Sequence, residues 1–157
     1  MIRKRITQWL LLLAACAALT GRASATAVCS VSSTGAAFGA FDPITPAAKD
    51  TLGTITVTCT GTVGDAVSYT IALSPGAGNF VTRDMQGPSN ITYNLFTDSG
   101  HQFIWGDGTN GTSLVSDTYT MSSGTVSRDY TVFGEIPQQS GPTVGSYMDT
   151  LTITLTY

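Results

Sequence analysis

Few residues of this chain carry groups that could act as catalysts. Histidine and glutamate each occur once, as His101 and Glu135. A Ser-His-Asp arrangement would have to use His101, which lies among turn-forming residues with no nucleophile-elbow motif nearby. Catalysis by paired carboxylates would need Glu135 together with a distant aspartate. We therefore interpret His101 as a solvated loop residue and Glu135 as a strand-surface residue, and predict that the protein is not an enzyme.

The segment that starts at Trp105 is the next candidate for chemistry. It contains Asp107-Gly108 and Asn110-Gly111, which could suggest a calcium loop, but the spaced oxygen ligands and the closing glutamate of an EF-hand are missing. Such pairs are typical of tight turns. Trp105 and Asp107 could instead contact a carbohydrate or another surface ligand. A monomeric secreted binding domain is therefore an alternative function that stays open.

Residues 1–25 are typical of a secretory signal peptide. A basic start is followed by an apolar run from Trp9 to Leu19 and by the small residues Ala23-Ser24-Ala25 for cleavage. The mature chain is predicted to begin at Thr26. The apolar run is about half as long as a membrane span requires, so a membrane-spanning protein is not expected. Residues 13–16 also fit a lipoprotein-processing site, which leaves lipidation of Cys16 open.

The two remaining cysteines are predicted to form a disulfide. Cys29 and Cys59 are the only cysteines left once the leader is removed, and export delivers the chain to an oxidising compartment where such pairs persist. Closing a loop of about 30 residues stabilises a fold by roughly 3–4 kcal/mol on the chain-entropy model. Two separated thiols and one histidine do not make ligand-spaced pairs, so neither a metal nor another cofactor is expected.

The charge balance of the mature chain argues against an anionic partner. Four of the seven basic residues lie in the leader, so three, namely Lys49, Arg83 and Arg128, remain beside ten acidic residues. Because phosphate binding needs clustered Lys or Arg, nucleic acid is not an expected partner. An anionic membrane surface is not an expected partner either.

Both arginines of the mature chain precede an aspartate. Neighbours along a strand face opposite sides, so neither Arg83-Asp84 nor Arg128-Asp129 forms a salt bridge by itself. We expect both arginines at the surface, although one could anchor a loop carbonyl or carboxylate.

The pattern of apolar residues predicts strands and no helices. Apolar and polar residues alternate in short runs, with abundant threonine on the polar side. The runs are 54–60, 69–73, 91–95, 130–136 and 151–157. Turn-forming residues separate them, and the polar stretch from Gly106 to Gly124 is predicted to be a long surface loop. We expect one domain over residues 26–157, an all-β, immunoglobulin-like antiparallel sandwich.

The order of several short motifs spans the whole mature chain. The motifs are Cys29, 38–41 (FGAF), 55–59 (ITVTC), 83–85 (RDM), 93–98 (YNLFTD), 105–108 (WGDG), 131–136 (TVFGEI), 145–151 (GSYMDTL) and the terminal Tyr157. Together they resemble the spore coat protein U domain, the family that also supplies subunits of archaic chaperone–usher pili.

This resemblance implies a sandwich that lacks its last strand. A periplasmic chaperone would hold it open, an outer-membrane usher would export it, and a strand from another pilus or coat subunit would complete it. The sequence stops at the end of an alternating strand, which we expect to be uncovered on one side. Leu151, Ile153 and Leu155 would face the acceptor groove, with Tyr157 at its end.

The sequence thus predicts a secreted structural subunit of a pilus or surface coat, with roles in cell adhesion and biofilm formation. Cleavage after Ala25 would leave only three residues, 26–28, ahead of Cys29. Three residues reach about 10 Å when extended, too little for a donor strand. We therefore expect a chain that accepts a strand but donates none, at the tip or another terminal position. The alternative is that coat members close their own sandwich by another route.

Overall fold

The computed structural model describes residues 27–42 and 47–157. The predicted signal peptide, its cleavage site and Cys16 lie outside these residues. The described residues form eight strands: β1 (Val28–Thr34), β2 (Lys49–Thr60), β3 (Ala66–Leu73), β4 (Arg83–Gln86), β5 (Asn90–Phe96), β6 (Val115–Thr120), β7 (Thr125–Ile136) and β8 (Ile153–Thr156). Within this part of the chain, nothing has the helical length and hydropathy needed to cross a membrane.

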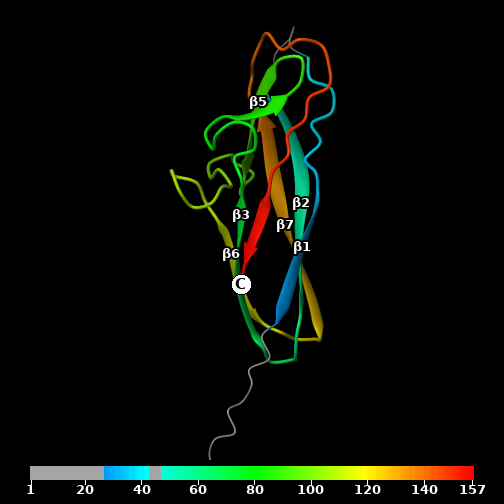
Figure 1. Ribbon diagram of the computed structural model, residues 1–157, viewed down its shortest axis with the longest axis vertical. Helices are drawn as coiled ribbons and strands as arrows, with labels where there is room; N and C mark the ends of the chain where they lie inside the picture. Colours follow the sequence, from blue (N-terminus) through cyan, green and yellow to red (C-terminus); the bar gives the residue numbers. More distant parts are fainter. Residues whose placement is uncertain (1–26, 43–46) are drawn as a thin grey trace, which may run out of the picture.

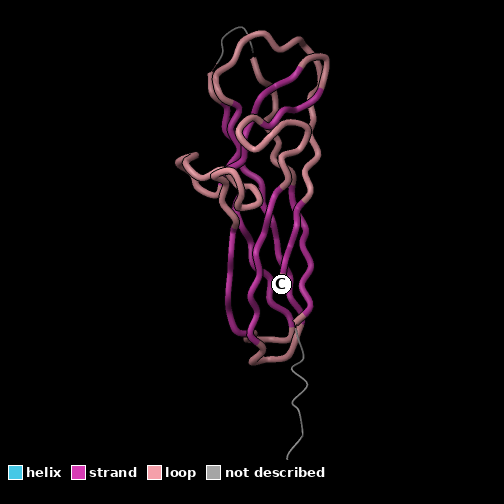
Figure 2. The backbone as a smooth tube through the Cα atoms, turned by 60° about the vertical axis from the view of Figure 1, so that its left-hand side comes forward, coloured by secondary structure: helices cyan, strands magenta, loops and turns pink. Residues whose placement is uncertain are grey.

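The strands form two antiparallel sheets. One sheet has the order β1-β2-β7-β5-β4 and the other the order β6-β3-β8. The long strands β2 and β7 pair over their full length, from Lys49 opposite Ile136 to Thr60 opposite Thr125. The sheets stand as two layers along the long axis of an elongated molecule (Figures 1 and 2). The predicted immunoglobulin-like sandwich is confirmed.

Alternating apolar side chains from both sheets make the core. In β2, Ile55, Val57 and Cys59 are buried, and the threonines between them are more exposed. In β3, Val67, Tyr69, Ile71 and Leu73 are buried in the same way. This is the pattern that a pleated strand with one inner face requires.

The disulfide joins β1 to β2. Cys29 and Cys59 are opposite each other in the β1–β2 ladder. Their sulfur atoms are bonded at 2.06 Å, and both residues are buried in the core cluster. The predicted pairing is present in the structure.

A chain of tyrosine hydroxyls connects the two sheets. The hydroxyl oxygens of Tyr69 in β3 and Tyr130 in β7 lie 2.6 Å apart. The Tyr130 hydroxyl donates to the carboxylate of Asp117 in β6, and Arg128 Nη1 lies 3.2 Å from the same carboxylate. Burial raises the pKa of Tyr130, and the hydrogen bonds with Asp117 and Tyr69 raise this pKa further. These hydrogen bonds join β3 and β6 of one sheet to β7 of the other.

The structure departs from the sequence analysis at several elements, and β1 and β4 lie in none of the predicted runs. The stretch 106–124 is not all loop, because it contains β6, which pairs with β3. Its half-buried positions are Val115, Asp117 and Tyr119, so an aspartate interrupts the apolar alternation. The last strand is also shorter than expected, since β8 begins at Ile153 and Leu151 lies in the segment before it.

Candidate functional site: a groove between the open edges of the sheets

Each sheet ends in an unpaired edge on the same side of the sandwich. Among the described residues, β1 pairs only with β2, and β8 pairs only with β3. The strands β1 and β8 approach each other in space, but no ladder joins them. The backbone groups along these edges are therefore free to pair with a further strand.

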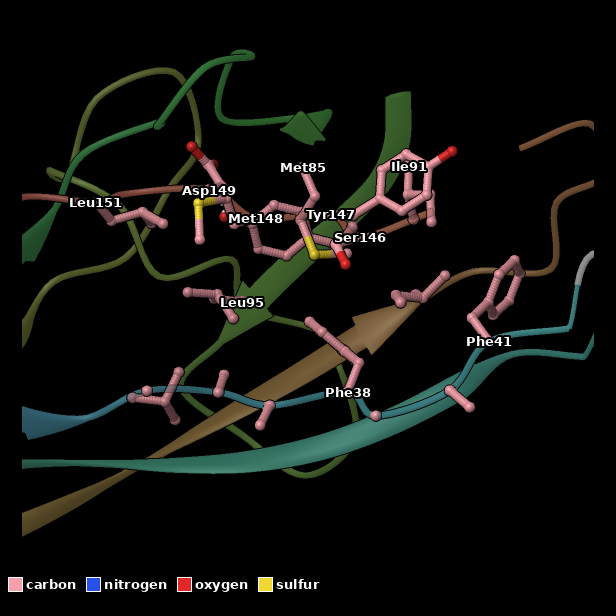
Figure 3. Close-up of a pocket in the computed structure, with 18 of the residues that line it drawn as sticks. Phe38, Phe41, Met85, Ile91, Leu95, Ser146, Tyr147, Met148, Asp149 and Leu151 are labelled. Atoms are coloured by element: carbon pink, nitrogen blue, oxygen red, sulfur yellow. Dashed lines mark hydrogen bonds between the residues drawn. The ribbon is translucent and has the colours of Figure 1, made fainter. Parts of the chain in front are cut away.

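An apolar groove with a cavity volume of about 720 Å³ opens where these two edges end, beyond the last residues of β1 and ahead of β8. One wall is the segment 33–41, which runs from the end of β1, and the other is the segment 142–153, which leads into β8. In Figure 3, Phe38 lies on the first wall and Tyr147, Met148 and Leu151 on the second. The floor consists of core residues: Ile55, Leu73, Ile91, Tyr93, Leu95, Val132 and Ile136.

The first wall is held by hydrogen bonds from β2 and packs against β5 and β7. Thr51 Oγ1 donates to the Ala37 carbonyl at 2.8 Å, and Lys49 Nζ donates to the Ala40 carbonyl. Phe38 packs edge-on against Tyr93, with ring centroids 5.9 Å apart. A Cβ atom at Gly134 would lie 3.0 Å from the Phe38 ring, so the absence of a side chain there makes room for the phenylalanine.

The second wall is fixed to β4 and β5. Gln86 and Met148 exchange two backbone hydrogen bonds of 2.8 and 3.0 Å. The Tyr93 hydroxyl donates to Asp149 at 2.7 Å. Burial raises the pKa of Tyr93, and the hydrogen bond to Asp149 raises this pKa further. An irregular segment is thus held as a defined wall, which keeps the groove open along its length.

Arg83 anchors the loops behind the second wall. It is fully buried, and its guanidinium donates to the carbonyls of Ser74 and Trp105 and to the side-chain oxygen of Asn94. Burial lowers the pKa of Arg83. The expectation of a surface position is wrong for Arg83, whereas its possible role as an anchor for loop carbonyls is what the structure shows. Arg128 is exposed and contacts Asp117 rather than the adjacent Asp129.

The predicted groove residues divide into two groups. Leu151 and Ile153 line the groove. Leu155 lies further along β8, half-buried against the core, and Tyr157 is 57% exposed at the end of the chain. Sequence reasoning missed Phe38 and Tyr147 as wall residues. Both lie within motifs that carried the family resemblance, but in segments without strand periodicity.

The loop predicted as a ligand site presents different chemistry. Trp105 is 0% exposed, and its indole Nε1 donates to the Ile71 carbonyl at 3.0 Å. Its ring is part of the core and offers no face to a carbohydrate. Asp107 is exposed, but its carboxylate accepts hydrogen bonds from Thr109, which lower the pKa of Asp107. The loop is a closed turn rather than a cleft.

His101 lies in a loop and Glu135 on a strand, as expected, but the two side chains lie beside each other. His101 Nδ1 lies 3.6 Å from a carboxylate oxygen of Glu135, and both side chains are only partly exposed. Asp50 lies directly opposite Glu135 in the β2–β7 ladder. Asp50 is therefore the carboxylate that the fold places beside Glu135.

The fold and the groove define a class of protein: an immunoglobulin-like sandwich whose sheets are left open along one edge. Residues 15–154 match the family model of the Spore Coat Protein U domain, and the chain belongs to this family. No curated protein matches the chain significantly.

A solved structure with a similar fold comes from a pilus system. It is a chain in the crystal structure of the CsuC–CsuE chaperone–tip adhesion subunit pre-assembly complex from archaic chaperone–usher Csu pili of Acinetobacter baumannii. The TM-score is 0.55 at 22% sequence identity, over 83% of this chain and 40% of that one. This chain therefore spans less than half the length of its structural neighbour, and the likeness shows the fold.

Proposed function

We propose that this protein is a secreted structural subunit of a pilus or surface coat, which assembles by accepting a β-strand from another subunit. The observation that carries the proposal is the apolar groove of about 720 Å³ at the ends of the unpaired edge strands β1 and β8. A strand laid along these edges would pair with backbone groups and fill the apolar groove, which core residues such as Ile55 and Val132 line. This is recognition by strand addition, in which backbone hydrogen bonds give affinity and side-chain pockets give specificity.

The same groove explains the need for a chaperone. An open edge beside an apolar groove invites aggregation unless another chain covers it. A periplasmic chaperone would cover the groove until an outer-membrane usher exchanges it for the donor strand of the next subunit. The family supports these partners, as does the neighbour whose structure is a chaperone–subunit complex. The subunit would then travel through the periplasm to the cell surface or to a fimbrium.

A terminal place in the fibre is the finer part of the proposal. Ala27, immediately before β1, is 5% exposed and packs in the core of its own sandwich. With the predicted cleavage after Ala25, the segment ahead of the disulfide would be too short to donate a strand. The subunit would then accept a strand without passing one on, as a tip or capping subunit does.

A donor-strand peptide tests the function. The mature protein, residues 26–157, is mixed with a synthetic peptide that copies the donor segment of a companion subunit, and with a scrambled peptide of the same composition as control. We expect a one-to-one complex by native mass spectrometry and a higher melting temperature with the donor sequence only. A protein that stays monomeric, ignores every companion peptide and never co-purifies with a chaperone would contradict the proposal.

A further inference from the structure

The single histidine and the single glutamate of the chain meet beside an aspartate. One ligand atom from each of Asp50, His101 and Glu135 lies within 4.8 Å of the others. The three residues come from the start of β2, the loop after β5 and the end of β7. Three remote segments therefore bring one nitrogen and two oxygen donors to one point.

Sheet register places the two carboxylates. Asp50 and Glu135 are direct partners in the β2–β7 ladder, and directly opposed residues point to the same face of a sheet. Val132 and Ile136 line the groove on the inner face of β7. Since neighbouring side chains alternate, Glu135 and Asp50 lie on the outer face, away from the groove.

The loop after β5 holds the histidine in position. The Asp98 carboxylate accepts backbone hydrogen bonds from Gly100, Gln102 and Phe103. His101 has a φ of 54°, a left-handed conformation that is uncommon for a residue other than glycine. Its ring packs against Phe96, with centroids 4.9 Å apart. The imidazole is thus directed toward Glu135 by the fold of the loop.

The charges of the cluster match a divalent cation. Two carboxylates face one imidazole, and the ion pairs formed by the described residues bring neither Lys nor Arg to Asp50 or Glu135. The 3.6 Å separation between His101 Nδ1 and Glu135 is too long for a good hydrogen bond. A bridging ion would satisfy all three groups better than they satisfy one another.

We propose that Asp50, His101 and Glu135 bind one divalent transition-metal ion, with Zn²⁺ the best fit to this donor set. Imidazole together with carboxylates suits Zn²⁺ in a four-coordinate site with water as the remaining ligand. Ligand atoms that share a zinc ion lie about 3.3 Å apart. The 4.8 Å limit of the cluster leaves only small side-chain rotations to close it. The ion would join β2, β7 and the loop after β5 while leaving the groove free.

Calorimetric titration of ZnCl₂ into the EDTA-treated mature protein tests the site. The protein carries no polyhistidine tag, because a tag would bind Zn²⁺ itself. We expect one ion per chain, a melting temperature that rises with ZnCl₂, and no comparable rise with MgCl₂, because Mg²⁺ prefers oxygen ligands.

Variants assign the binding to these residues. His101→Ala and Glu135→Gln should each weaken Zn²⁺ binding by at least the roughly 10–100-fold that even an outer-shell partner is worth. Asp129→Asn, which changes another exposed carboxylate of β7, should bind as the unmodified protein does. Far-UV circular dichroism checks that each variant is folded, and Glu135→Gln keeps the side-chain shape if His101→Ala fails to fold. The proposal would be overturned if the unmodified protein bound no Zn²⁺, or if folded His101→Ala and Glu135→Gln bound it as tightly as the unmodified protein does.

Discussion

Arg83 is a buried cation whose guanidinium contacts carbonyl oxygens instead of a carboxylate. Four donated hydrogen bonds reach Ser74, Trp105 and Asn94, which belong to three separate segments. Asn94 in turn donates to the carbonyls of Phe80 and Val81. One side chain thereby fixes the loops that support the second wall of the groove.

Replacing Arg83 with methionine should destabilise the fold strongly. Methionine fills a similar volume but leaves buried carbonyl oxygens without donors, and each such group costs about 1–3 kcal/mol. We expect the free energy of unfolding, measured by urea denaturation, to fall by roughly 3 kcal/mol. Arg128→Met is the matched control, and its exposed ion pair with Asp117 is worth about 1 kcal/mol or less. If Arg83→Met and Arg128→Met lowered the free energy of unfolding equally, the buried hydrogen bonds of Arg83 would contribute no more to stability than an exposed ion pair.

The hydroxyl chain between the sheets makes stability sensitive to alkaline pH. Burial and hydrogen bonding raise the pKa of Tyr130 above its ordinary value of 10.0. Because the unfolded chain ionises first, the stabilisation is complete below about pH 10 and is lost as the pH rises further. We expect the free energy of unfolding to fall between about pH 10 and 12, and to fall less steeply in Tyr130→Phe.

At neutral pH, Tyr130→Phe should cost about 1–3 kcal/mol, since a hydrogen bond to a carboxylate is lost. The exposed Tyr157 provides the control, because Tyr157→Phe should alter neither the neutral stability nor its pH dependence. Parallel alkaline profiles for the unmodified protein and Tyr130→Phe would refute the assignment.

At the scale of elements, β8 carries the proposed strand acceptor. Ile153 pairs with Leu73 and lines the groove, whereas Thr154 is exposed on the opposite face of the strand. Ile153→Asp would place an unpaired charge against the incoming strand. We expect donor-peptide affinity to fall by about 100-fold or more, which corresponds to roughly 3 kcal/mol, together with loss of chaperone co-purification.

Thr154→Asp is the control for this prediction, because it introduces the same charge on the same strand but away from the groove. Its donor-peptide affinity should stay close to that of the unmodified protein. If Ile153→Asp still assembled at the normal level, this face of β8 would not be buried in the complex.

Periodicity predicted the strands in which several successive inner positions are apolar. The runs around Ile55, Tyr69, Ile91 and Val132 became β2, β3, β5 and β7. The alternation did not predict β6, because Asp117 occupies an inward position, where Tyr130 and Arg128 satisfy its charge. Such compensation comes from other strands and leaves no local signal.

The walls of the groove could not be predicted in the same way. The segments 33–41 and 142–153 are mostly irregular, and their positions depend on remote partners. The Tyr93–Asp149 hydrogen bond spans 56 residues of sequence. The Gln86–Met148 bridge is equally non-local. Sequence reasoning located the last strand beside the groove, but not what stands opposite it.

At the scale of the whole molecule, register decides what meets. Asp50 and Glu135 become neighbours only because β2 and β7 pair over 12 residues each. A slip of one residue would place them on different faces. The outer cluster and the inner groove therefore follow from the same ladder, with neighbouring positions of β7 serving opposite faces of one sheet.

The last prediction concerns assembly by this chain alone. A donor needs a strand of several residues, and strands are usually 3–10 residues long. Ala27 is packed in the core of its own sandwich, so with the predicted cleavage after Ala25 no donor segment of that length would precede β1. We therefore expect the purified mature protein to form no long polymers when concentrated, as judged by light scattering and electron microscopy.

The control is the same chain with a companion subunit's donor segment fused ahead of Thr26. This fusion should form fibres, because each groove then meets a donor on the next copy. Fibres grown from the unmodified chain would contradict the terminal assignment, since they would require a donor segment elsewhere in the chain.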